Sequence, residues 1–85
     1  MIDEDQARTA AQDYFGDVEV HLESFDEGWR IVPLYSDRRG AGALVVKRED
    51  GELLLFPSAI SRRRVMEEFP KFQHYGIHIG RVENG

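Results

Sequence analysis

Residues 42–56 read GALVVKREDGELLLF, and this stretch decides the fold. Two strand-like runs, Ala43–Arg48 and Glu52–Phe56, flank an Asp50-Gly51 turn. Both turn residues tolerate positive φ, and the resulting turn matches the twist of paired strands. The stretch therefore predicts a β-hairpin. Because its runs are nearly continuously apolar, they are typical of central strands that are buried over most of their surface.

Upstream, the spacing of apolar residues predicts an amphipathic helix over residues 3–15. Its buried stripe falls at helical intervals and comprises Ala7, Ala10, Ala11, Tyr14 and Phe15. Asp3 and Gln6 form a capping-box pattern at the start, and Gly16 supplies a left-handed stop.

Between the helix and the hairpin, two further strands are predicted. In residues 17–25, Val18, Val20 and Leu22 alternate with polar residues, which is typical of a strand with one face in water. A turn at residues 26–28 leads to a second strand over residues 29–35, in which Pro33 takes an edge or bulge position. We expect Trp29 to pack in the core beneath the helix, and the alternative is an exposed anchor for a partner. Residues 36–42 form the longest loop.

Downstream, Ser58 or Ser61 can cap a short helix that ends before Pro70. Residues 75–79 alternate between apolar and small or polar residues, which allows either a fifth strand or a loosely attached tail. The prediction is an α+β fold in which the N-terminal helix packs across a curved antiparallel four-stranded meander, with the other sheet face in water. A single domain spans residues 1–70, and residues 71–85 follow as a C-terminal strand or tail.

The length of 85 residues fits one domain. There is no cysteine, so the sequence offers no disulfide framework and no thiolate metal site. No apolar run reaches the length of about 20 residues that a membrane span requires. The acidic N-terminus is unlike the basic start of a signal peptide, so we expect a cytoplasmic protein without a membrane partner.

The charge is unevenly distributed along the chain. Residues 1–27 carry a net charge of −8 and residues 28–85 a net charge of +3. Proteins that bind phosphate backbones usually concentrate positive charge, so nucleic acid is not an expected partner. A basic protein would be attracted to the acidic half, although the acids could equally serve solubility alone.

A predicted partner-binding patch follows from strand alternation, which places Glu19 and Glu23 on one face. The turn acids Asp26 and Glu27 extend it. Together they predict a negative surface for a basic partner, and the alternative is an ordinary solvent-facing sheet surface.

Other candidate sites are weaker. His74 and His78 have a metal-ligand spacing, but Gly76 lies between them and no third ligand is indicated, so no metal or cofactor is predicted. Arg62, Arg63 and Arg64 lack interleaved aromatic residues, and ion pairs with the acidic half are the favoured explanation for them. No serine has the context of a catalytic nucleophile, so no catalytic residue is predicted.

Several of these segments resemble the YrhB-like domains, also called the immunity protein 35 family. The resemblance covers about residues 3–60 and rests on four stretches: Asp13-Tyr14-Phe15, Gly28-Trp29, Gly40 to Gly42 and Asp50-Gly51-Glu52. It implies a small non-catalytic α+β protein that neutralises a toxin by protein–protein binding. It also implies an alternative, a chaperone-like activity.

Three hypotheses about function therefore stand. The first is an immunity-type binding module, monomeric or a weak homodimer, whose acidic half meets a basic toxin domain. The second is a chaperone-like or structural domain that self-associates through a sheet edge. The third is a small metallo- or hydrolytic enzyme that uses His74 and His78.

Overall fold

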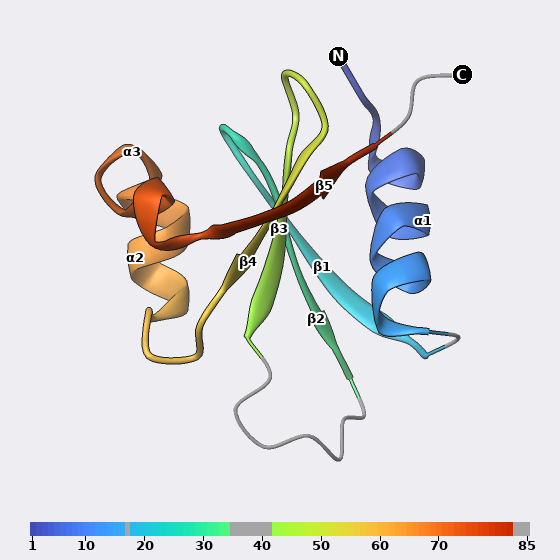
Figure 1. The fold of residues 1–85 in the computed structure, drawn as a ribbon, viewed down its shortest axis with the longest axis horizontal. Helices are drawn as coiled ribbons and strands as arrows, with labels where there is room; N and C mark the ends of the chain where they lie inside the picture. The colour runs from blue at the N-terminus through green and yellow to red at the C-terminus, as the bar shows by residue number, and fades with distance from the viewer. Residues whose placement is uncertain (17, 35–41, 83–85) are drawn as a thin grey trace.

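The computed structural model of the chain describes residues 1–16, 18–34 and 42–82 (Figure 1). One helix precedes a five-stranded sheet, and two short helices and a 3₁₀ turn come before the last strand. In chain order the elements are α1 (Glu4–Phe15), β1 (Val20–Phe25), β2 (Gly28–Pro33), β3 (Ala43–Lys47), β4 (Glu52–Phe56), α2 (Arg62–Glu67), α3 (Phe69–Phe72), η1 (Gln73–Tyr75) and β5 (Ile77–Arg81).

The sheet has the strand order β1-β2-β3-β4-β5, and every neighbouring pair is antiparallel. The predicted α+β fold with an N-terminal helix and a meander is therefore confirmed, and residues 77–81 supply the fifth strand. A register shift opposite Leu53 and Leu54 places a bulge in the β4–β5 pair. The predicted loop at residues 36–42 lies outside the described residues except for Gly42.

The capping box predicted for α1 is confirmed. The Asp3 carboxylate accepts from the Gln6 backbone N–H at 2.9 Å, and the Gln6 side chain accepts from the Asp3 N–H at 3.0 Å. Gly16 ends the helix with a φ of 91°, but its ψ of −173° is extended, so the predicted left-handed cap is wrong in ψ.

The predicted buried stripe of α1 holds for Ala7 and Ala11, which are fully buried. Tyr14 is 45% exposed, so its predicted burial is wrong. Residues 7, 11 and 15 form one row of the helix surface and face the sheet, whereas Ala10 and Tyr14 form the adjacent row. Tyr14 instead packs edge-on against Phe15, with ring centroids 5.1 Å apart.

The prediction that one sheet face stays in water is wrong, because helices cover both faces. Figure 1 shows α1 on one side of the strands and α2 and α3 on the other. The α1-side cluster comprises Ile2, Ala7, Ala11, Val20, Trp29, Ile31, Leu44 and Val46. The opposite cluster comprises Val45, Leu54, Phe56, Val65 and Phe69. Successive residues of β3 point to opposite faces, so its apolar run needs two covers.

Trp29 lies in the core beneath α1, as predicted, with 3% of its surface exposed. The Arg48 guanidinium lies 4.3 Å from the centre of the indole ring and donates to the Phe25 carbonyl at 2.9 Å. A cation over an aromatic face is attracted by the ring quadrupole. Arg48 therefore covers the end of the core beside the β1–β2 turn.

The helix α2 begins as the sequence predicts, whereas α3 and η1 were not predicted. The Ser61 hydroxyl accepts from the Arg64 N–H at 3.3 Å and caps α2, which ends before Pro70. Pro70 then stands in the first turn of α3, where its missing N–H is tolerated. Phe69, at the start of α3, faces the sheet and packs on Phe25 and Phe56.

Gly28 provides a test of sheet geometry. A Cβ at this position would lie 2.0 Å from the Val46 carbonyl oxygen, so the backbones of β2 and β3 would have to separate. We expect Gly28→Ala to lower the free energy of unfolding by at least about 2 kcal/mol, measured by chemical denaturation. Asp26→Ala, at an exposed position of the same turn, is the control and should change it by less than about 0.5 kcal/mol. Equal effects of both variants would contradict the close approach.

Candidate functional site

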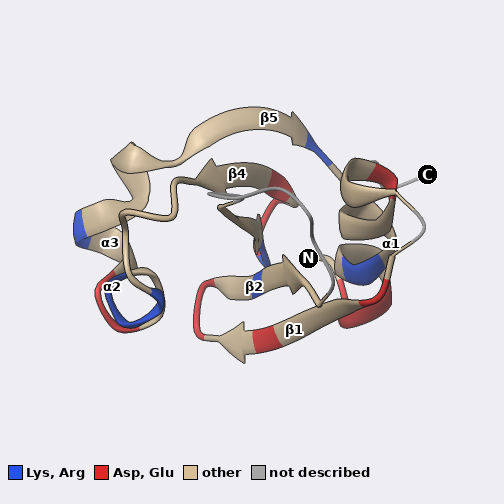
Figure 2. Ribbon diagram, turned by 90° about the horizontal axis from the view of Figure 1, so that it is seen from below, with Lys and Arg blue, Asp and Glu red and all other residues tan. Residues whose placement is uncertain are grey.

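The structure spreads the predicted acidic patch along the outer strand β1. Glu19 precedes β1 and is exposed, and Asp26 and Glu27 form the turn at its other end. At about 3.3 Å per residue, the two ends lie on the order of 20 Å apart. Figure 2 shows acidic residues on both β1 and α1. The patch is therefore a strip with its charges at the two ends and Glu23 between them.

Glu23 is held by two arginines. Arg30 lies directly opposite on β2, and the Arg30 Nη1–Glu23 Oε1 distance is 3.2 Å. Arg62, at the start of α2, donates to the other carboxylate oxygen. The hydrogen bond and charge of Arg62, followed by the charges of Arg30 and His21, hold the pKa of Glu23 below its ordinary value. Glu23 therefore links the sheet to the α2 layer, and its charge is offset locally.

The Arg30 guanidinium depends on the Glu23 carboxylate as its counter-ion. Its side chain is 16% exposed, and burial lowers the pKa of the Arg30 guanidinium while Glu23 raises it. Among the described residues its Nε has no hydrogen-bond partner. A partly buried cation with one strong counter-ion is costly to leave unpaired.

The arginine triplet is divided among three roles. The predicted pairing with the acidic half is right for Arg62, which binds Glu23. Arg63 instead pairs with Glu67 one turn along α2, and Arg64 lies 5.1 Å from the centre of the Phe72 ring. Arg38 and Arg39 lie outside the described residues.

The two spaced histidines lie on different elements. His74 is in η1 and stacks near Tyr75, whereas His78 is in β5 and bonds Glu52 through Nδ1 at 2.9 Å. No group of three His, Asp or Glu residues in the described segments is arranged to hold a metal ion.

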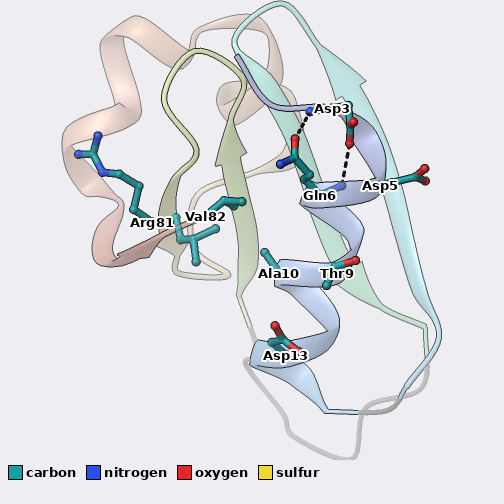
Figure 3. Close-up of a pocket in the computed structure, with 9 residues that line it drawn as sticks. Asp3, Asp5, Gln6, Thr9, Ala10, Asp13, Arg81 and Val82 are labelled. Carbon is teal, nitrogen blue, oxygen red and sulfur yellow. Dashed lines mark hydrogen bonds between the residues drawn. The ribbon is translucent and has the colours of Figure 1, made fainter. Parts of the chain in front are cut away.

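A groove between α1 and the end of β5 was not predicted. It has a volume of about 560 Å³ and is lined by Asp3, Asp5, Gln6, Thr9, Ala10, Asp13, Leu53, Arg81 and Val82 (Figure 3). Ala10, Leu53 and Val82 make its apolar part, and carboxylates stand along the helix. The sequence signal for it was the row of small and polar residues beside the buried stripe of α1.

The immunity protein 35-like domain family matches the chain over residues 5–76. The chain belongs to this family. The match extends beyond the predicted resemblance and includes α2, α3 and η1. Comparisons with curated proteins and with solved structures gave no significant match. In the described part of the chain, no helix has the length and apolar character needed to cross a membrane.

The Glu23 pairs predict a pH-dependent contribution to stability. Because the pKa of Glu23 in the fold lies below its ordinary value of 4.5, the contribution is complete above that pH and is lost as the pH falls through the lowered pKa. We expect Glu23→Gln to lower the free energy of unfolding at neutral pH by about 1–2 kcal/mol. Denaturation curves of the wild type and the variant should begin to converge below pH 4.5 and coincide once the pH has fallen below the lowered pKa of Glu23.

The control for this variant is Glu67→Gln, which removes an ion pair whose side chains are 84% and 64% exposed. Exposed pairs contribute little, so a change within about 0.5 kcal/mol is expected. A gap between wild type and Glu23→Gln that stays constant in acid would show that the lost stability does not come from ionisation of Glu23.

Proposed function

We propose that this chain is an immunity-type protein that binds and neutralises a toxin in the bacterial cytoplasm, without catalysis. Membership of the immunity protein 35-like family carries this proposal. The charge supports it, because the acids are concentrated in residues 1–27, where they favour a basic partner. The direct test is co-expression with the toxin encoded beside the gene. Restored growth and co-purification are expected, and unchanged toxicity would overturn the proposal.

The acidic patch of Glu19, Glu23, Asp26 and Glu27 is proposed to guide the toxin to this surface. Glu23 is engaged inside the protein, so the available charges are those of Glu19, Asp26 and Glu27. Exposed charges act mainly on the rate of association, through long-range attraction that salt screens.

A charge-reversal experiment tests the patch. Glu19→Lys combined with Asp26→Lys should lower the association rate constant for the toxin by roughly tenfold at low salt and leave dissociation nearly unchanged. Surface plasmon resonance at two salt concentrations measures both rates. Glu67→Lys combined with Glu68→Lys makes the same charge change at the C-terminal end of α2 and should have a much smaller effect. Equal slowing by both pairs would assign the effect to net charge alone.

Self-association is the second candidate function, supported by exposed apolar residues on and beside the edge strand β5. Tyr75, Ile77 and Ile79 are 51%, 61% and 36% exposed, and within the described segments β5 pairs only with β4. An unpaired strand edge with apolar side chains favours pairing with a second copy.

Light scattering over a range of concentrations tests this candidate. If β5 mediates a weak homodimer, the apparent mass of the wild type should rise with concentration, and Ile77→Lys should hold it at the monomer mass. Leu34→Lys is the control, because Leu34 is similarly exposed at 50% but lies beyond the end of β2. A constant monomer mass for the wild type would exclude self-association through β5.

A further inference from the structure

The groove between α1 and β5 has the form of a docking site for a peptide segment. Its α1 wall runs from Asp3 to Asp13, which corresponds to a length of about 15 Å. Its volume lies in the range of about 300–1,000 Å³ that is typical of ligand-binding pockets. The groove is therefore long enough for several residues of a partner.

The apolar part of the groove results from small side chains. Ala10 lies on the helix row next to the buried Ala7 and Ala11, and it is only partly buried. On the sheet side, Gly80 pairs with Leu53 and presents no side chain of its own. Leu53 and Val82 pack against the α1-side core from the edge and are only partly buried. An apolar side chain of a partner that seats here would bury this apolar surface, which is favourable.

The charges beside the groove are negative and unbalanced. Neither Asp5 nor Asp13 forms an ion pair with the described part of the chain, and the nearby Arg8 pairs with Glu4. Arg81 belongs to the lining, but its guanidinium lies 3.4 Å from Asp50 and extends away from α1 (Figure 3). The groove therefore complements cationic side chains.

We propose that this groove binds a segment of the toxin in which an apolar side chain is flanked by lysine or arginine. The apolar residue seats on Ala10, Leu53 and Val82, and its basic neighbours face the carboxylates of α1. This inference rests on the proposed function for the identity of the partner. In contrast to the β1 strip, the groove provides short-range contacts and should therefore govern dissociation.

An NMR titration of the full chain tests the groove without the toxin. The probe is a short acetylated lysine–leucine peptide, and a glutamate–leucine peptide of equal length is the matched control. We expect the lysine peptide to shift the amide signals of Thr9, Ala10, Asp13, Leu53 and Val82, with smaller shifts at higher salt. Shifts confined to Glu19, Asp26 and Glu27, or equal shifts with the glutamate peptide, would overturn the proposal.

Two substitutions separate the groove from the rest of the surface. Ala10→Phe fills it and should weaken binding of the lysine peptide at least roughly tenfold, whereas Gln12→Phe, on an exposed part of α1, should leave binding unchanged. If Ala10→Phe disturbs the fold, Asp13→Lys gives the same test by charge, with Glu67→Lys as its control. Full binding by whichever of these groove variants folds would overturn the proposal.

The outcome for the toxin distinguishes this inference from the proposed function. If the wild type neutralises the toxin and Ala10→Phe neutralises it equally well, the groove is not the docking site and the proposed function stands. If the wild type does not neutralise the toxin, the proposed function fails, and the peptide titration still decides whether the groove binds basic segments.

Discussion

The structure depends on the need to cover both faces of β3. Leu44, Val45 and Val46 are consecutive and fully buried, so their side chains point alternately toward α1 and toward α2. Burial of each such side chain stabilises the fold by about 1.5–3 kcal/mol, and a face left in water would forfeit several of these contributions. The short α2–α3 segment is therefore a second layer of the fold, and it places Arg62 and Phe69 where they meet β1.

Local signals in the sequence were sufficient for the elements but not for the layers. The capping box, the alanine stripe and the Asp50-Gly51 turn each act within a few residues, and the structure has the helix and the hairpin that they predict. The second layer was missed because α2 and α3 bury only Val65 and Phe69, too few apolar residues for a clear helical period. The informative signal was the unbroken apolar run of β3, which could not alternate between core and water.

The candidate surfaces likewise combine features that local sequence signals predict with contacts that only the folded chain brings together. Strand alternation placed Glu23 correctly on the face opposite Leu22, but it could not show that Arg30 lies across the strand pair. Nor could strand alternation show that Arg62, 39 residues later in the chain, binds Glu23. The groove was still less accessible to sequence reasoning, because α1 and β5 come from opposite ends of the chain and meet only in the folded sheet.

The internal pairing of Glu23 also affects how negative charge is distributed over the surface of the protein. Two guanidinium groups offset this carboxylate, and α2 carries three adjacent arginines, so the α2 side is neutral to basic. Asp5 and Asp13 of α1 form no ion pair with the described part of the chain, and α1 packs directly on β1 and β2. The acidic strip runs along β1, on whose α2-facing side Glu23 meets Arg62, whereas the groove lies between α1 and β5. The acids of α1 are therefore the charges nearest to the groove, and the acids at the ends of β1 add to the attraction of a basic partner from a greater distance.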